Sequence, residues 1–246
     1  MRIDLHFSQL STICLVVLCT LAIPFSTTAV RSQQLPEYLN STLQIENAKQ
    51  PSVSVSYPVF GKKNIDKAIK FFVDNQAAAY LQMANENFEE MDEESRKLAQ
   101  WDMNGTFTVT QPSEDVVSVV FTIESYSGGA HGNYSEEVLN FDLKTDRELQ
   151  FQDLFEEPSV ALKLLSQYCA SALKEKIGEQ ADADMITYGT YPTLANFSEI
   201  QLAPGEVIIH FQPYQVAPWV EGAPQIVVPL KKLSEAKPEA EVFSPN

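Results

Sequence analysis

The sequence predicts an α+β fold, with antiparallel sheet and two main helices arranged in one domain or in two tightly joined halves. A segment before residue 60 alternates apolar and polar residues as a strand does. Two later segments repeat apolar residues at helical spacing, and each is followed by short β-branched runs. The predicted order is therefore strand, helix, three or more strands, helix and further strands.

The first strand and the first helix are predicted between residues 52 and 88. Ser52–Phe60 alternates as a half-buried strand does, and Gly61 ends it. Asn64 is a favourable N-cap for a long amphipathic helix. Its apolar stripe comprises Ile65, Ala68, Ile69, Phe72, Ala79, Tyr80 and Met83. The acidic stretch Glu89–Glu94 lacks calcium-loop spacing, so we interpret it as a solvated turn or a fraying helix end.

Strand signals then follow. An antiparallel meander is predicted from strands beginning at Thr106 and spanning Val116–Ile123 and Val138–Leu143, and a tight turn leads to a short strand around Leu149 and Phe151.

The second helix should begin at Pro158 and end at Gly178. Its apolar stripe is Leu162, Leu165, Cys169, Ala172 and Leu173, which makes Cys169 a small core residue rather than a reactive thiol. Later strands are expected at Phe197–Leu202, Val207–Phe211 and Gln225–Val228, with a short tail helix over Lys231–Lys237 and no regular structure in residues 238–246.

Residues 1–29 resemble a signal peptide. Arg2 precedes the apolar run Ile13–Phe25, and small residues up to Ala29 provide a cleavage site. The run is shorter than the roughly 20 apolar residues that span a bilayer, and the residues before Cys14 and Cys19 do not fit a lipid-attachment motif. Cleavage would leave 217 of the 246 residues: a linker or arm over 30–50, halves over 51–150 and 151–232, and a tail over 233–246.

Charge and cysteine content limit the partners. The net charge is −16, which disfavours nucleic acid and anionic membrane surfaces and favours a cationic partner. Only Cys169 would remain after cleavage, so we expect no intrachain disulfide and a stability that depends on core packing. We expect no membrane insertion of the mature chain, and the sequence leaves the oligomeric state open.

Motifs for catalysis and cofactors are missing from the sequence. The mature chain has two histidines, His131 and His210, and it contains neither His-Glu-x-x-His nor Cys-x-x-Cys. We expect His210 to face solvent or to be hydrogen-bonded locally, since it lies within a strand pattern. Gly-x-Ser-x-Gly and Ser-x-x-Lys are also absent. We predict no metal, no cofactor and no catalytic residue, although paired carboxylates stay open in so acidic a chain.

Two segments are candidate binding loops. The glycine loop, Ser127–Asn133, has three glycines in five residues, and it forms either a hairpin turn or a nest of backbone N–H groups for an anion or a sugar hydroxyl. Its candidate residues are Gly128, Gly129, His131 and Asn133. The proline–aromatic loop, Gln212–Pro224, offers Pro213, Tyr214, Pro218 and Trp219 as rigid anchors, or else folds back as a lid on the core.

Together these segments resemble a bacterial family that includes the extracellular domain of the anti-sigma factor RsiV, a lysozyme receptor, and the non-catalytic domain beside the deacetylase domain of PdaC. The matching motifs, within residues 51–232, are Tyr57-Pro58, Ser127–Asn133, Asn140–Thr145, Asp153–Phe155, Phe211–Trp219 and Val228–Leu230. The resemblance implies a PdaC-type half over 51–150 and an RsiV-like half over 151–232. The sequence shows neither a sigma-binding segment with a spanning helix nor a deacetylase domain, so regulation by proteolysis and sugar deacetylation are not implied.

The resemblance implies a periplasmic or secreted, non-catalytic binding module of the envelope. Its ligand is expected to be a lysozyme-like cationic protein or the glycan of peptidoglycan. The alternative is an envelope hydrolase of unknown chemistry that uses carboxylates or His131. A binder and a hydrolase differ in whether substitutions change affinity or turnover.

The export hypothesis predicts the mass of the mature protein. The protein recovered from the extracytoplasmic fraction should begin at residue 30, because the apolar run ends in small residues that a signal peptidase accepts. Intact-mass measurement checks the cleavage site. A mass that retains residues 1–29, or lipid on Cys19, would contradict the hypothesis.

Overall fold

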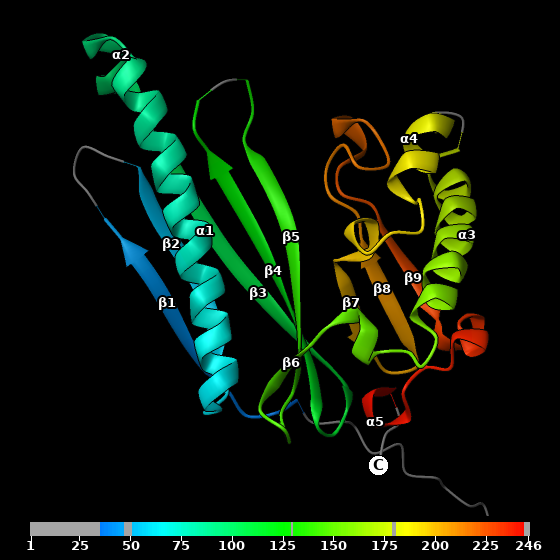
Figure 1. The fold of residues 1–246 in the computed structure, drawn as a ribbon. Helices are drawn as coiled ribbons and strands as arrows, with labels where there is room; N and C mark the ends of the chain where they lie inside the picture. The colour runs from blue at the N-terminus through cyan, green and yellow to red at the C-terminus, as the bar shows by residue number, and fades with distance from the viewer. Residues whose placement is uncertain (1–34, 47–50, 129, 179–180, 244–246) are drawn as a thin grey trace, which may run out of the picture. The chain divides into compact units, whose positions relative to one another are not determined.

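The computed structural model describes residues 35–46, 51–128, 130–178 and 181–243. Contacts join these described residues into one compact unit, which contains two sheets (Figure 1). The predicted signal peptide, residues 1–29, lies outside the described residues. Among the helices in the described ranges, none combines the length and the apolar composition needed to cross a membrane. The α+β prediction is confirmed.

The larger sheet has six strands in the order β1 to β6. The strands are β1 (Leu39–Ile45), β2 (Ser52–Val59), β3 (Asp102–Ser113), β4 (Val116–Tyr126), β5 (Asn133–Asp142) and β6 (Arg147–Leu149). The predicted meander is present as β3, β4 and β5, which pair antiparallel in sequence order. Strands β2 and β3 pair in parallel because the chain crosses over between them through two helices.

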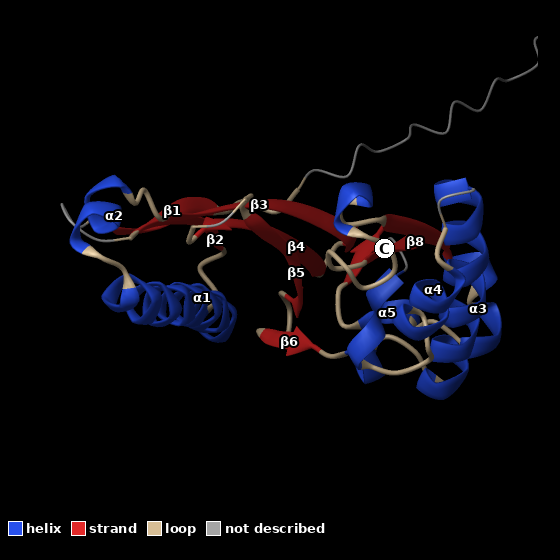
Figure 2. Cartoon of the chain, turned by 90° about the horizontal axis from the view of Figure 1, so that it is seen from above, coloured by secondary structure: helices blue, strands red, loops and turns tan. Residues whose placement is uncertain are grey.

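Helix α1 (Lys63–Glu90) covers one face of this sheet (Figure 2). Its buried side chains are Ile65, Ile69, Val73, Ala77, Tyr80 and Ala84, and they pack against strand residues such as Val55 and Phe121. The predicted cap by Asn64 is wrong, since the helix begins at Lys63 and its N-cap residue is Lys62. The carboxylate of Asp146, from the turn after β5, instead accepts hydrogen bonds of 3.1 Å from the N–H groups of Asn64 and Ile65. The helix start is thus fixed by a distant residue.

The acidic stretch after α1 is divided between two helices. Helix α1 ends at Glu90, and the short helix α2 (Glu93–Leu98) begins after Asp92. The side chain of Asp92 accepts hydrogen bonds from the backbone N–H and the hydroxyl of Ser95. These bonds lower the pKa of Asp92, with the backbone N–H as the larger cause. This segment is therefore a capped helix–helix turn.

The smaller sheet has three antiparallel strands, β7 (Ile200–Ala203), β8 (Glu206–His210) and β9 (Gln225–Pro229). Helix α3 (Pro158–Ile177) packs on it, with proline in the first turn and Gly178 at the C-cap, as predicted. Buried Leu165, Cys169 and Leu173 contribute to this core. The C-terminal half also contains α4 (Ala183–Gly189) and the 3-10 turns η1 (Phe151–Asp153), η3 (Ala195–Phe197), η4 (Trp219–Glu221), η5 (Leu230–Lys232) and η6 (Ser234–Ala236).

The structure corrects the sequence prediction at several segments. Strand β1 lies inside residues 30–50, which we interpreted as a linker or arm. The tail forms two 3-10 turns in place of a helix over Lys231–Lys237, and helix α5 (Ala240–Phe243) follows where no regular structure was expected. Val242 and Phe243 of α5 are buried in the C-terminal core. Phe151 and Phe197, which were expected to lie in strands, belong to 3-10 turns.

Strand β7 joins the two sheets through its own backbone. Its outer edge would expose unpaired N–H and C=O groups, which are costly to bury. Thr110 donates to the carbonyl of Leu202 at 2.7 Å, and the hydroxyl of Ser118 accepts from the N–H of Leu202 at 3.2 Å. Asn140 donates to the carbonyl of Ile200 at 2.9 Å. We call these contacts the polar seam; they hold the smaller sheet against β3, β4 and β5.

The burial of Cys169 predicts its reactivity. The side chain is fully buried, and burial raises the pKa of its thiol to about 12. A thiol reagent should therefore label the folded protein at least about a hundredfold more slowly than the unfolded chain, since labelling requires local opening. The rates are compared in a preparation beginning at residue 30, before and after denaturation. Equal rates would remove Cys169 from the core.

Candidate functional site

The two candidate loops meet in the structure. The ring of His131, from the glycine loop, stacks on Trp219 of the proline–aromatic loop, with centroids 4.5 Å apart and planes at 20°. Tyr214 lies 5.7 Å from Trp219, and Tyr134 at the start of β5 meets Trp219 edge-on at 5.5 Å. We call His131, Tyr134, Tyr214 and Trp219 the aromatic cluster. Two segments 88 residues apart in sequence thus build one surface.

The proline–aromatic loop is anchored to β5 by one glutamine. The side-chain amide of Gln212 donates to the carbonyl of Glu136 at 2.5 Å and accepts from the N–H of Glu136 at 3.3 Å. The loop is also closed at its base by a 3.0 Å hydrogen bond from the N–H of Phe211 to the carbonyl of Pro224. Because Tyr134 lies two residues before Glu136, this anchor places the loop beside the start of β5.

Two backbone features fix the aromatic rings. Tyr214 adopts φ of +67°, a left-handed conformation that a bulky side chain rarely takes. Gly222, at φ of +71°, packs so closely that a Cβ atom there would lie 2.9 Å from the hydroxyl of Tyr134. Val216 and Ala217 between the proline positions are buried. The loop is therefore part core lid and part exposed surface, with Tyr214 57% exposed.

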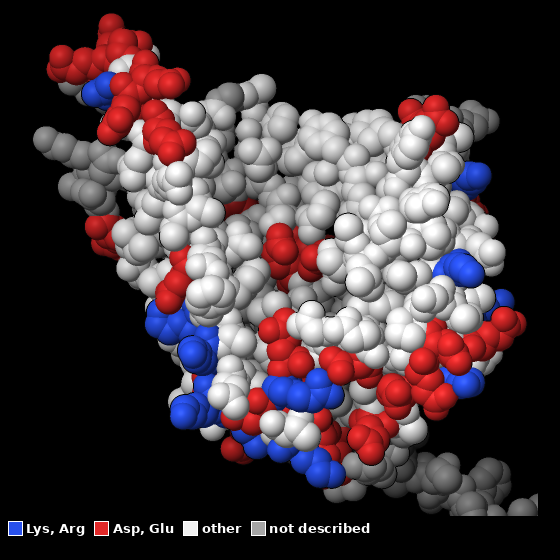
Figure 3. Space-filling view, viewed as in Figure 1, with Lys and Arg blue, Asp and Glu red and all other residues white. Residues whose placement is uncertain are grey.

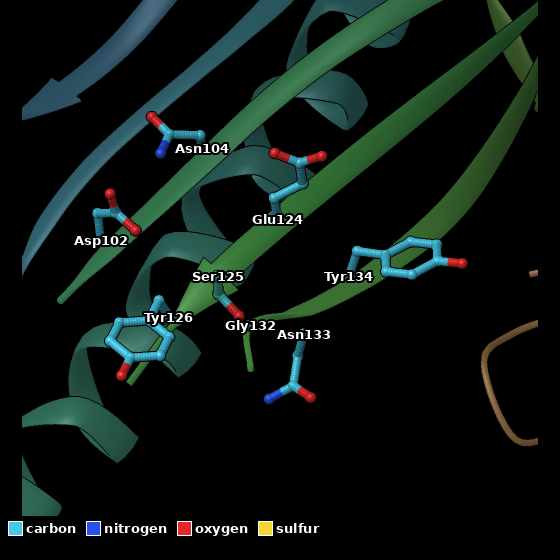
Figure 4. Close-up of a pocket in the computed structure, with 8 residues that line it drawn as sticks. All are labelled: Asp102, Asn104, Glu124, Ser125, Tyr126, Gly132, Asn133 and Tyr134. Carbon is cyan, nitrogen blue, oxygen red and sulfur yellow. The ribbon is translucent and has the colours of Figure 1, made fainter. Parts of the chain in front are cut away.

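A polar cavity of about 400 Å³ adjoins the aromatic cluster (Figure 4). Asp102 and Asn104 of β3 and Glu124 of β4 line it on one side, and Tyr134 lies across from them. Its other lining residues are Ser125, Tyr126, Gly132 and Asn133. Tyr134 belongs to both the cavity and the aromatic cluster. The two features therefore adjoin through one side chain.

A hydrogen-bonded carboxylate lies behind the cluster. Glu136 contacts Nδ1 of His210 at 2.7 Å and accepts from Gln225 at 3.0 Å, and Nε2 of His210 lies 2.7 Å from Oε1 of Gln201. Burial acts to raise the pKa of Glu136, but the bonds from His210 and Gln225 outweigh it and hold the pKa below its ordinary value. His210 is buried with both ring nitrogens in contact, which agrees with the expectation of local hydrogen bonding and not with a solvent-facing side chain.

A second carboxylate has a raised pKa. Burial, and then the nearby charge of Glu199, raise the pKa of Glu137 to about 7. Glu199 itself accepts a 2.6 Å hydrogen bond from the N–H of Val138. Acidic side chains are visible over β5, in the hollow between α1 and the elements of the smaller sheet (Figure 3). Glu137 and Glu199 are thus neighbouring carboxylates, which is the kind of pair that the hydrolase alternative requires. Among the described residues, no three acidic, histidine or cysteine side chains group as metal ligands.

The glycine loop combines turn geometry with close packing. Gly128 has φ of +90° and packs against the ring of Trp101, and a Cβ on Gly132 would lie 3.2 Å from the carbonyl oxygen of Ser125. Both features fit the hairpin-turn alternative. His131 is exposed, with Nδ1 2.8 Å from the carbonyl of Gly132, and Asn133 lines the polar cavity. Gly129 lies outside the described residues.

Several residues of the site were not predicted from the sequence. Pro213 and Pro218 flank Tyr214 and Trp219 as expected, whereas Tyr134, Gly222 and the cavity residues Asp102, Asn104 and Glu124 were not singled out. Tyr134 directly follows Asn133 of the glycine loop, and that adjacency was the available signal. The others depend on pairing between strands distant in sequence. The role of the selected residues in binding a ligand stays a prediction.

Comparisons with known proteins match two segments of the chain. The family model "Deacetylase PdaC" matches residues 45–134, and "Protein of unknown function (DUF3298)" matches residues 152–231. A curated relative, "Peptidoglycan-N-acetylmuramic acid deacetylase PdaC" of Bacillus subtilis strain 168, is 26% identical over 218 residues. The match covers 81% of this chain and 46% of the relative, so the chain spans less than half of that protein.

Solved structures show the same fold. A DUF3298 family protein from Pseudomonas aeruginosa PAO1 has a TM-score of 0.53 at 19% identity, with 84% of this chain and 95% of that chain covered. A DUF3298 member from Bacteroides fragilis NCTC 9343 has a TM-score of 0.55 at 18% identity, with 82% and 94% covered. At this identity the likeness concerns the fold alone.

The raised pKa of Glu137 predicts a pH-dependent stability. At pH values between the ordinary carboxyl pKa and about 7, Glu137 keeps its proton in the folded state but has released it in the unfolded chain. Stability therefore falls as the pH rises through this range. Glu137→Gln should therefore raise the melting temperature at pH 8, and the gain should shrink toward pH 5. Thermal melts at both pH values measure it, with exposed Glu124→Gln as control. A gain independent of pH would contradict the raised pKa.

The turn geometry predicts the effect of filling the glycine loop. Gly128→Ala should lose about 1 kcal/mol or more of stability, since a side chain at positive φ is strained. Gly132→Ala, without positive φ, should lose less because only the carbonyl of Ser125 must move. Denaturant unfolding compares the two variants. Unchanged stability with lost ligand binding would favour the nest alternative.

Proposed function

The chain is a member of the PdaC-type/DUF3298 domain family, and on this premise we propose that it is an exported, non-catalytic binding module of the bacterial cell envelope. The deacetylase activity in the relative's name belongs to a protein of which this chain spans 46%. Export rests on the signal-peptide pattern of residues 1–29. The binding role rests on the aromatic cluster.

The observation that carries the proposal is the stack of His131 on Trp219. Each loop alone has an ordinary structural explanation, but their contact presents several aromatic rings on one fixed surface. Rigid aromatic side chains bind with little loss of conformational entropy. Tyr214 strengthens the inference, because a strained left-handed backbone at an exposed tyrosine adds nothing to folding, and such strain is concentrated at functional sites.

A cell-wall glycan is the ligand that this geometry supports best. The apolar face of a sugar ring packs against aromatic rings, and its hydroxyl and amide groups need polar partners. The cavity beside Tyr134 supplies Asn104 and Asn133 as amide groups and Glu124 as an acceptor. The relative's name places that protein on peptidoglycan, which agrees with this ligand class.

A cationic protein of the lysozyme type is the second candidate ligand. The chain carries a net charge of −16, and Asp102 and Glu124 place carboxylates in the cavity. Such charges accelerate encounter with a basic partner and disfavour anionic ones. The charge therefore favours a protein ligand, whereas the ring-and-amide geometry favours a glycan.

A hydrolase is supported less well. Glu137 has a pKa suited to acid–base exchange, but its neighbour Glu199 is engaged by the N–H of Val138. His131 is engaged in the stack with Trp219 and contacts Gly132. Incubation with peptidoglycan or chitin oligosaccharides separates the classes. Turnover that Glu137→Gln or His131→Ala abolishes would overturn the binding-module proposal.

Removing the central ring should weaken binding. Trp219→Ala is expected to cost ~2 kcal/mol, roughly a thirtyfold loss of affinity for peptidoglycan fragments or lysozyme, mainly through faster dissociation. Surface plasmon resonance with both ligands measures it. Phe71→Ala, which removes an exposed ring from α1, is the matched control. Folded Trp219→Ala protein with unchanged dissociation from whichever ligand binds would place the site elsewhere.

Tyr214 offers a test in which stability and affinity move in opposite directions. Tyr214→Gly relieves the left-handed backbone, so it should raise stability by about 1 kcal/mol while lowering affinity. Tyr214→Ala removes the same ring but keeps the strain. Melting temperatures and affinities of the pair are compared. If Tyr214→Gly lowers stability, the tyrosine ring supports folding rather than recognition.

A further inference from the structure

A second group of exposed apolar side chains lies on the segment that follows α3. Tyr188, at the end of α4, is 77% exposed, Tyr191 is 62% exposed and Leu194 is 53% exposed. We call these three residues the tyrosine face. In the rest of the described chain, no stretch of seven residues holds three exposed large apolar side chains. Exposed apolar side chains that are grouped in this way on one short segment indicate a candidate interaction surface.

The backbone under the tyrosine face is held by side-chain amides. Asn196 donates to the carbonyls of Tyr188 and Tyr191 at 2.8 and 2.9 Å. Gln215 donates to the carbonyls of Gly189 and Asn196 at 3.0 and 3.1 Å, which ties the segment to the proline–aromatic loop. A Cβ on Gly189 would lie 2.1 Å from the carbonyl oxygen of Gln215. The exposed rings are therefore presented by a preorganised segment.

The core does not require these exposed rings. Ile186, Thr190 and Phe197, from the same segment, are buried and provide its packing. Tyr188 and Tyr191 alternate along the chain with these buried residues and expose most of their side-chain surface to solvent. A fixed backbone that exposes two tyrosines lowers the ordering cost of a partner's binding.

The charge of the segment that carries the tyrosine face indicates the kind of partner. No lysine or arginine occurs between Lys176 and Lys231, whereas that interval contains six acidic residues. Asp182 and Asp184, at the start of α4, are exposed, as is Glu221 in the proline–aromatic loop. Figure 1 shows α4 and that loop at the same end of the smaller sheet. An acidic, aromatic surface complements a basic polypeptide.

We propose that the tyrosine face is a docking surface for an arginine-bearing basic polypeptide. The planar guanidinium stacks on tyrosine rings and pairs with carboxylates, whereas the lysine ammonium does not stack in this way. This inference rests on the proposed role as a binding module, and it assigns basic polypeptides to a surface separate from the glycan site at Trp219.

The test uses fluorescent octa-arginine and octa-lysine as probes on the mature protein. We expect octa-arginine to bind several-fold more tightly than octa-lysine, and a Tyr188→Ser, Tyr191→Ser double variant to lose about tenfold of the octa-arginine affinity. Tyr188→Phe with Tyr191→Phe should retain that affinity, because the rings remain. Phe71→Ala, which removes an exposed ring from α1, should bind as the wild type does.

Three results would overturn the docking surface: no octa-arginine binding, equal affinity for the two probes, or an unchanged affinity in the folded double serine variant. Peptidoglycan binding is measured on the same proteins. If it is lost in Trp219→Ala and kept in the double serine variant, the two surfaces are separate. If no variant binds peptidoglycan or lysozyme while octa-arginine still requires the tyrosines, the proposed function fails and the docking surface stands.

Discussion

The arrangement of the site depends on the polar seam between β7 and the larger sheet. Hydrophobic contact alone would let one sheet slide on the other, but Thr110, Ser118 and Asn140 each bond a particular backbone group of β7 and so fix its position. The seam is not complete, since Oδ1 of Asn140 is buried without a partner among the described residues. A buried polar group left unpaired costs stability, so the seam exchanges stability for a defined alignment. That alignment brings the glycine loop, which precedes β5, next to the loop that follows β8.

The hydrogen bonds around Glu136 connect the aligned sheets to the proline–aromatic loop at the surface. The side chain of Glu136 is held by His210 and Gln225 from the smaller sheet, while its backbone is held by Gln212 at the base of the proline–aromatic loop. One residue of β5 is thus bonded to three positions of the C-terminal half. Because the lowered pKa of Glu136 keeps it charged near neutrality, its bonds are charge-assisted and stronger than neutral ones. A substitution in this hydrogen-bond network would therefore displace the stacked rings of His131 and Trp219, although the substituted residue does not contact them.

Structural features that local interactions determine could be predicted from the sequence, whereas features that depend on contacts between distant residues could not. Pro158 and Gly178 act within one helix, so its two ends were predicted correctly. Capping of α1 by Asp146 joins positions about 80 residues apart, and no local pattern reveals it. Strand β1 was missed because its polar residues are half-exposed on a sheet edge, where alternation is weak. Likewise both loops of the site were found from their glycines, prolines and aromatics, but the stack of His131 on Trp219 follows from strand order.

The two aromatic surfaces differ in how the chain maintains them, and this difference bears on recognition. Trp219 is half-buried against His131 and Tyr134, so its ring is fixed by neighbouring rings. In the described part of the chain no aromatic ring packs against Tyr188 or Tyr191, and Asn196 holds their backbone carbonyls, so their side chains keep rotamer freedom. A ring held in place suits a ligand of fixed shape such as a sugar, whereas rings that can turn suit a flexible chain whose guanidinium groups approach from several directions. This contrast in packing therefore supports different ligand classes for the two proposed surfaces.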